Sequence, residues 1–213
     1  MYEIALRDGA WQMVRPSRYA RRFTMDTPFS VRGPAAGHAM LQTAADPAGR
    51  TVLGTLNNSA ASQTPWGTYL SGEENWMVYF GGGDNLSAHH RRWGMRKDGF
   101  CGWDKFDTRF DATKNPNEPN RFGWVVEVDP MDPTSTPVKR TALGRAAALG
   151  HGGDTQARRW RDRHLTARRY AESAATMAAR RAYQLSAGSR SAVCVWKWSR
   201  PGSTTQMAGV GLP

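Results

Sequence analysis

Turn-forming residues interrupt the first two thirds of the chain so often that only short strands can form there. Apolar positions alternate on either side of Asp8-Gly9 in "YEIALRDGAWQMV", and this dipeptide tolerates the positive φ of a tight hairpin turn. Further segments have strand composition and end at Gly, Asn or Pro, namely "TVLGTLNN", "WGTYLSG", "GWVVEVDP" and "PVKRTAL". Many short strands with such punctuation predict a mainly β fold, either a sandwich, a barrel or a propeller.

Few segments of this part of the chain predict helices. The stretches "GHAMLQTAAD" and "NLSAHHRRW" favour short ones, and the tryptophans Trp66, Trp93, Trp103 and Trp124 are expected in the core. The stretch "KNPNEPNRFG" is expected to be an irregular polar loop, because its Pro and Asn residues disfavour regular structure.

The composition changes after Arg145. Residues 1–145 hold 18 Lys and Arg against 15 Asp and Glu, whereas residues 146–213 hold 11 against 3, and ten of those 11 are Arg. From Thr155 to Ala187 the chain has no Gly or Pro and is rich in good helix formers, but its apolar residues keep no helical period. We therefore expect a β region over residues 1–145 and a basic tail over residues 146–213 that is helical or disordered.

The origin of this tail has two explanations. One is a genuine basic extension, and the other is a shifted reading frame of a GC-rich gene, since Ala, Arg and Gly codons dominate such frames. Sequencing of the locus distinguishes them, because an intact, uninterrupted frame would exclude the second explanation.

The spacing of the cysteines argues against a zinc site, and the absence of a long apolar run argues against a membrane-spanning protein. Cys101 and Cys194 have no spacing that suits a zinc site, and they form either one disulfide or two free thiols. No run approaches the roughly 18–20 apolar residues that a membrane span needs. The start "MYEIALRDG" does not resemble a signal peptide, so the chain is expected to stay where it is made.

Two adjacent carboxylates, Glu73 and Glu74, follow two small residues in "TPWGTYLSGEENW". They are hard oxygen ligands of the kind that Ca²⁺ or a trivalent metal prefers. Alternatively, Ser71 caps a short helix and Glu74 completes a Ser-x-x-Glu capping box. The spacing alone is compatible with both explanations.

A basic segment offers a second kind of candidate. The cations of "HHRRW" and "RKDG", among them Arg96, can receive a phosphate ester, although such residues also occur in ordinary solvated loops.

Motifs distributed over the first two thirds of the chain carry a family resemblance. In order along the chain they are "GPAAGH", "LGTLNN", "TPWGT", "EEN" and "PVKRTALGR". Together they resemble the body of PhoX-type alkaline phosphatases and cover essentially Tyr2 to Arg145. The resemblance implies a partial β-propeller from a phosphatase that hydrolyses phosphomonoesters with iron and calcium held by carboxylates and a cysteine. Members of the family are often exported.

The resemblance also implies site residues. Glu73 and Glu74 lie in the metal region of the family and are the first candidate ligands, with Asn57 and Asn58 as weaker ones. His38, His151 and Arg96 are candidates for a supporting or phosphate-contacting role, and His38 is alternatively a satisfied helix-capping histidine.

Two departures from the family pattern bear on the metal. Gly72 stands where family members with an iron-binding cysteine have that cysteine, and Gly152 stands where the family has a ligand glutamate. A shell that lacks a thiolate and a carboxylate is expected to hold iron poorly.

Three functions therefore remain open for this chain. The first is a metal-dependent phosphatase acting on a phosphate ester. The others are an inactive fragment and a polyanion binder that uses the Arg-rich tail, although no motif for reading nucleic acid is visible, so nucleic acid is an unlikely partner.

Overall fold

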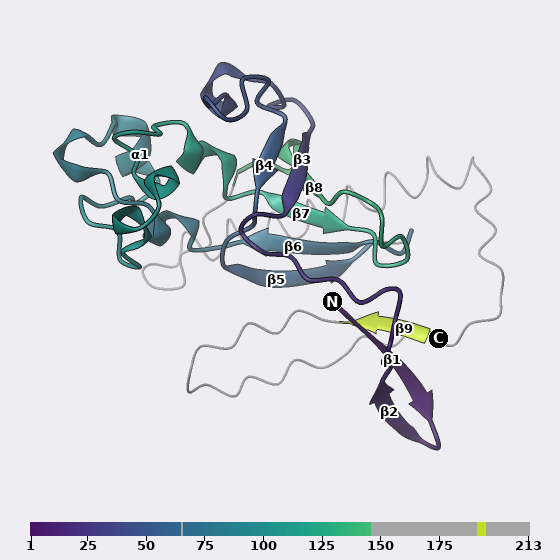
Figure 1. Ribbon diagram of the computed structural model, residues 1–213. Helices are drawn as coiled ribbons and strands as arrows, with labels where there is room; N and C mark the ends of the chain where they lie inside the picture. The colour runs from purple at the N-terminus through teal and green to yellow at the C-terminus, as the bar shows by residue number, and fades with distance from the viewer. Residues whose placement is uncertain (65, 146–190, 195–213) are drawn as a thin grey trace, which may run out of the picture.

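The described residues form two open β-sheets and a group of short helices (Figure 1). The computed structural model describes residues 1–64, 66–145 and 191–194. Its strands are β1 (Tyr2–Arg7), β2 (Ala10–Met13), β3 (Pro28–Arg32), β4 (Thr51–Leu53), β5 (Asn58–Gln63), β6 (Tyr69–Glu73), β7 (Val125–Val128), β8 (Val138–Arg140) and β9 (Ser191–Cys194). The predicted mainly β fold is confirmed, and each predicted strand segment contains or overlaps one of these strands.

The larger sheet has the strand order β4-β3-β8-β7-β6-β5. All neighbouring strands in it are antiparallel except β3 and β8, which are parallel. Strands β4 and β5 are its two edges, so the sheet does not close on itself. This arrangement makes β8, β7 and β6 consecutive strands inside the two edges, where a buried polar residue must find its partner within the protein.

The first two strands form the hairpin predicted from Asp8-Gly9. Both turn residues have positive φ, 50° and 78°, and the strands pair Leu6 with Trp11 and Arg7 with Ala10. Positive φ at both central positions is the signature of the turn that matches the right-handed twist of two strands. Strand β9 pairs with the other edge of β1, so the four described residues of the tail form a strand rather than a helix. The helix expected over Thr155 to Ala187 lies outside the described residues.

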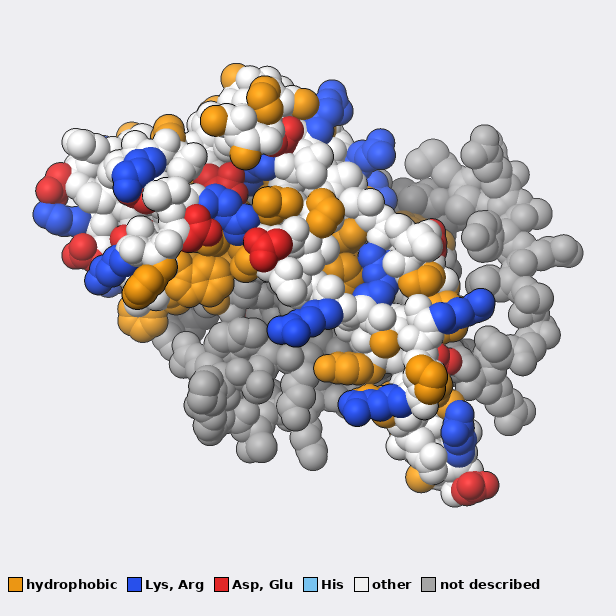
Figure 2. Space-filling model, viewed as in Figure 1, with side chains coloured by type: hydrophobic (Ala, Val, Ile, Leu, Met, Phe, Trp, Pro, Cys, Tyr) orange, Lys and Arg blue, Asp and Glu red, His pale blue; other side chains and the backbone are white. Residues whose placement is uncertain are grey.

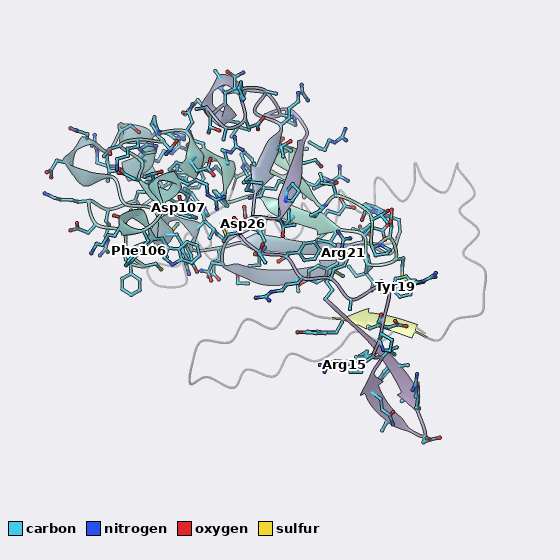
Figure 3. All side chains as sticks on the ribbon, viewed as in Figure 1. Arg15, Tyr19, Arg21, Asp26, Phe106 and Asp107 are labelled. Carbon is cyan, nitrogen blue, oxygen red and sulfur yellow. The ribbon has the colours of Figure 1, made fainter. Side chains whose placement is uncertain are left out.

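Arg21 attaches the segment after the hairpin to the larger sheet. Its guanidinium donates hydrogen bonds to the carbonyls of Asp132 and Ser135, at 2.9 and 2.5 Å, in the loop between β7 and β8 (Figure 3). The ring of Phe23 lies under the same guanidinium, at 4.9 Å from its centroid. This cation therefore joins two segments that are more than a hundred residues apart in sequence.

The helices are short, and most of them gather around α1 at one end of the larger sheet, whereas the helical segment between β3 and β4 lies apart (Figure 1). Those in the described residues are α1 (Ala88–Arg92) and the 3-10 helices η1 (Ala39–Leu41), η2 (Trp76–Tyr79), η3 (Gly83–Asn85), η4 (Trp103–Lys105), η5 (Thr108–Phe110), η6 (Glu118–Arg121) and η7 (Thr141–Leu143). The two predicted helices correspond to η1 and α1, and the Ser87 hydroxyl caps α1 by accepting from the His90 N–H. No helix in the described ranges is long and apolar enough to cross a membrane.

The expectation of an irregular loop at "KNPNEPNRFG" was wrong for η6, which is helical and fully buried. Proline is tolerated here because it stands in the first turn, where its missing N–H has no helical partner anyway. Arg121 at the end of η6 donates to the Leu41 carbonyl at 2.9 Å and pairs with Glu118 at 3.2 Å and Asp46 at 3.3 Å. The polar side chains of η6 can be buried because they form hydrogen bonds and ion pairs within the protein, as Arg121 does with the Leu41 carbonyl and the Asp46 carboxylate.

The main core lies between the helical layer and the larger sheet. Trp76, Phe80 and Phe122 are fully buried in it, and ring centroids are 6.3 Å apart for Trp76 and Phe80 and 5.6 Å apart for Phe80 and Phe122. Of the tryptophans expected in the core, Trp124 is buried and Trp93 and Trp103 pack against the cluster. Trp66 instead donates its indole N–H to Glu127 at 3.0 Å. The main core therefore confirms three of the four tryptophan predictions.

A backbone contact at Gly54 provides a test of this packing. Gly54 and Gly67 both have positive φ, 78° and 90°, but a Cβ on Gly54 would lie 2.7 Å from the Met25 backbone, whereas one on Gly67 would meet nothing within 4 Å. Both alanine variants share the φ strain, so the difference between them isolates the steric clash. We expect Gly54→Ala to lower the free energy of unfolding by about 1–3 kcal/mol more than Gly67→Ala, measured by urea denaturation. Equal losses would contradict this packing.

Candidate functional site

The two adjacent glutamates at the end of β6 occupy different environments. Glu73 is the last residue of the strand and is 2% exposed, whereas Glu74 follows it and is partly exposed. Successive side chains of a strand point to opposite faces, so only one of two neighbours can enter the core. The structure therefore separates the pair into a buried and an accessible carboxylate.

The Glu73 carboxylate accepts four hydrogen bonds. Oε1 accepts from Lys139 Nζ at 2.9 Å and from the Leu56 N–H at 3.1 Å. Oε2 accepts from the N–H groups of Gly123 and Trp124, at 2.9 and 3.1 Å. Two carboxylate oxygens offer about four lone-pair positions, so all of them are occupied by protein donors.

Lys139 is the charged partner of Glu73 and is itself 0% exposed. Its ammonium also donates to the Arg121 carbonyl at 3.1 Å and lies 4.0 Å from the centroid of the Phe122 ring. Burial lowers the pKa of Lys139, and the neighbouring Glu73 carboxylate opposes that change. The residue lies in the middle of β8 between the buried valines Val31 and Val126, with which it is paired in the sheet.

Arg145 brings a second cation to this region. Its guanidinium lies 4.1 Å from the centroid of Trp76 and 4.6 Å from that of Trp93, and it donates to the carbonyls of Phe122 and Pro119 at 2.9 and 2.6 Å. Burial lowers the pKa of Arg145 to about 9, while the charge of Glu73 acts in the opposite direction. The guanidinium therefore stays charged at neutral pH, and Glu73 lies in the field of two cations.

Glu74 and Asn57 meet beside this buried group. The Glu74 N–H donates to the Asn57 carbonyl at 3.0 Å, and Asn57 has a φ of 47°, which asparagine tolerates better than most residues. In the described part of the chain, no hydrogen bond or ion pair engages the Glu74 carboxylate. An accessible carboxylate thus stands next to a turn of the backbone without a cation of its own.

Asn58 lies next to Glu73, the buried glutamate of the pair Glu73 and Glu74. It lies opposite Glu73 in the pairing of β5 with β6, and its Oδ1 accepts from the Thr55 hydroxyl at 2.9 Å. Its Nδ2 is buried and has no partner among the described atoms. A buried amide N–H without a partner is uncommon in folded proteins.

The remaining candidates lie elsewhere or outside the described residues. His38 is exposed and its Nδ1 accepts from the Met40 N–H at 3.2 Å, so it caps η1, the second of the two roles open to it. Arg96 is exposed and forms an isolated bridge with Gly81. Neither makes a hydrogen bond or ion pair with Glu73 or Glu74 within the described residues. His151 and Gly152 lie outside them.

The capping-box explanation of the Glu pair was wrong. Ser71 lies inside β6 and is buried, so it caps no helix. The following helix, η2, begins at Trp76 and has no side-chain cap. The strand continues through Ser71 because β6 pairs with both neighbours, β5 and β7, over this stretch.

The residues fit a bound cation unequally. Glu73 does not fit, because four donors occupy its oxygens and two cations lie beside it. The Glu74 carboxylate has no such partner among the described residues, and the Glu74 N–H donates to the Asn57 carbonyl. The described residues contain no cluster of three or more Asp, Glu, His or Cys that could hold a metal. They therefore supply fewer ligands than the six to eight oxygens that calcium prefers.

The two cations that define this site carry no distinct signal in the sequence. Lys139 lies in the predicted strand "PVKRTAL" between Val138 and Arg140, and only the sheet pairing places it between Val31 and Val126. The environment of Arg145 is likewise formed by Trp76 and Trp93, which are distant from it in sequence.

Comparison with a solved structure defines the class of fold. The chain matches a structure described as Pseudomonas fluorescens PhoX in complex with vanadate, a transition state analogue, with 50% sequence identity and a TM-score of 0.65. The match covers 67% of this chain and 25% of that one. The open sheets are thus part of a propeller-like fold.

A family comparison gives the more particular assignment. The model described as alkaline phosphatase PhoX matches residues 1–148. The chain belongs to the PhoX alkaline phosphatase family, and the resemblance drawn from its motifs is confirmed. It spans about a quarter of the P. fluorescens chain that it matches. No curated protein gives a significant match.

The buried ion pair can be tested through stability. Lys139→Met leaves the Glu73 charge buried without its partner, and we expect the free energy of unfolding to fall by about 3–5 kcal/mol. The matched control is Lys97→Met, which removes an exposed ion pair with Asp84 and should cost at most about 1 kcal/mol. Urea denaturation of both variants provides the measurement. Similar losses in the two variants would show that Lys139 does not compensate a buried charge.

Proposed function

We propose that the protein takes part in metal-dependent hydrolysis of phosphomonoesters, as a phosphatase of the PhoX type. The observation that carries this proposal is the family match over residues 1–148, together with 50% identity to a PhoX structure that holds vanadate. Bound metal ions favour such chemistry because they neutralise phosphate oxygens and lower the pKa of a bound water. The substrate we propose is accordingly a phosphate ester.

Within this chain, Glu74 is our proposed metal ligand, with the Asn57 turn beside it. Support comes from its accessible carboxylate, which has no cationic partner among the described residues. Asn58 is a weaker candidate, because its amide is oriented by Thr55 on the side of Glu73. A shell of carboxylate and amide oxygens suits calcium better than iron, and Gly72 provides no thiolate.

The face shown in Figure 2 does not favour the polyanion-binding alternative. Figure 2 shows Lys and Arg side chains scattered over the visible face, with acidic side chains among them, rather than gathered in one stripe. A binder of nucleic acid usually presents a basic stripe or patch. The excess of arginine after Arg145 lies almost entirely outside the described residues.

Metal removal tests the proposed function. We expect the purified chain to contain calcium or iron by elemental analysis, and its hydrolysis of an aryl phosphate to be lost with a chelator and restored when the metal returns. Absence of both metal and turnover would indicate that the chain is an inactive member of its family.

Substitution of the proposed ligand gives a sharper test. Glu74→Gln keeps the size of the side chain but removes its charge, so metal content and turnover should fall by roughly tenfold or more. The control is Asp84→Asn, which changes an exposed carboxylate paired with Lys97 at 2.8 Å. Equal activity in the two variants would exclude Glu74 from the metal site.

A further inference from the structure

One face of the hairpin formed by β1 and β2 is apolar. Residues that stand opposite each other in two paired strands lie on the same face of the sheet. Leu6 pairs with Trp11 and Ile4 pairs with Met13, so these four side chains share one face. Leu6, Trp11 and Met13 are 52%, 54% and 44% exposed, and the hairpin extends away from the larger sheet (Figure 1). A contiguous apolar surface of this kind marks a site of interaction.

Strand β2 is an edge of the three-stranded sheet, and its outward backbone groups can be identified. The Val14 N–H donates to the Glu3 carbonyl at 3.0 Å, and bonded pairs alternate with non-bonded pairs along two antiparallel strands. The N–H and C=O groups of Trp11 and Met13 therefore point away from β1. Within residues 1–64, 66–145 and 191–194, no strand or loop bonds to these four groups.

The sequence of β2 does not protect this edge. Proteins commonly prevent an edge strand from pairing with another chain by means of lysine, proline or a bulge. All four residues of Ala10–Met13 are exposed, none is charged or proline, and the pairing with β1 is regular. The outward side of β2 is therefore open to a further strand.

A second copy of β2 complements this edge when a two-fold axis passes through Gln12. Gln12 then stands opposite its own counterpart as a non-bonded pair, because its N–H and C=O point toward β1. Trp11 of each copy stands opposite Met13 of the other as a bonded pair. Two such pairs give four backbone hydrogen bonds, which satisfy all four outward groups on each copy.

Charge supports this register over the neighbouring one. The axis through Gln12 brings Arg15 of each copy opposite Gly9 and beside Asp8 of the other, so opposite charges meet at both ends of the contact. An axis through Trp11 would give one bonded pair in place of two, because the next outward residue would stand opposite the turn.

We propose that two copies of this chain associate through antiparallel pairing of their β2 strands about a two-fold axis at Gln12. The six strands then form one sheet, and its apolar face is continuous across both copies. Each copy uses its β2 edge once, so the assembly closes at two. The contact is small, and we expect a dissociation constant of roughly 1–100 µM. The proposal is independent of the phosphatase activity proposed above.

Sedimentation velocity of the full 213-residue chain, from about 1 to 300 µM, tests the association. We expect a monomer at the lowest concentration and a dimer at the highest. Gln12→Glu places two carboxylates opposite each other on the axis and should raise the dissociation constant about tenfold or more. The matched control is Gln63→Glu, which changes an exposed glutamine in the edge strand β5 and should leave the dissociation constant unchanged.

Disulfide cross-linking tests the register. In Gln12→Cys the two Cα atoms of a non-bonded pair would lie about 4.5 Å apart, within reach of a disulfide, so mild oxidation should yield a covalent dimer. In Ala10→Cys the two positions are separated by four residues along the strands, more than about 12 Å, and should not cross-link. The unaltered chain, with Cys101 and Cys194, gives the background.

Three results would overturn the proposal. The first is a monomer at every concentration of the unaltered chain, which would mean that something other than a second copy covers the edge. The second is an equal dissociation constant for Gln12→Glu and Gln63→Glu, which would place the contact elsewhere. The third is equal cross-linking of Gln12→Cys and Ala10→Cys. Far-UV circular dichroism checks the fold of each variant, and the cysteine variants decide the register even if Gln12→Glu does not fold.

Discussion

The ammonium of Lys139 meets the carboxylate of Glu73 inside the protein, and the centre of the larger sheet depends on that contact. Both side chains are 0% exposed, so each charge would be very unfavourable without the other. Three backbone N–H groups and the Arg121 carbonyl complete the hydrogen bonding of the pair. A buried ion pair adds little net stability compared with apolar residues, but it specifies which strands must lie side by side. Here it requires β6 and β8 to flank β7.

The same contact connects the sheet with the helical layer. Lys139 donates to the carbonyl of Arg121, and Arg121 in turn binds Glu118, Asp46 and the backbone of the η1 region. Burial raises the pKa of Glu118, while Arg121 and Arg109 oppose this change. The loops are long and contain little regular structure, so buried charges perform much of the ordering that helices and strands provide elsewhere.

Local sequence was sufficient to predict most strands of the described residues, but not β3 or β9 and not the contacts between strands. Asp8-Gly9 determines a hairpin turn by itself, because its φ values depend on two residues only. The helix η6 escaped prediction because its stability comes from bonds between Arg121 and segments about 80 residues earlier in the chain. The separation of Glu73 from Glu74 was likewise invisible, since it depends on the register of β6 against β7 and on Lys139, 66 residues away. Motifs identified the family, whereas the different burial of the two glutamates required the three-dimensional arrangement.

Adjacent acidic residues in a metal-binding family invite the assumption that both are ligands. The structure opposes it, because the two carboxylates lie in different environments. In this protein β6 pairs with β7 as far as Gly72 and with β5 as far as Glu73, and Glu74 lies just beyond the end of the strand. One glutamate is therefore committed to the interior, where its charge must be matched by lysine, and only the other can meet a cation from solvent. Lys139 explains how the Glu73 carboxylate can lie buried at the end of β6, because its ammonium donates to Oε1 at 2.9 Å.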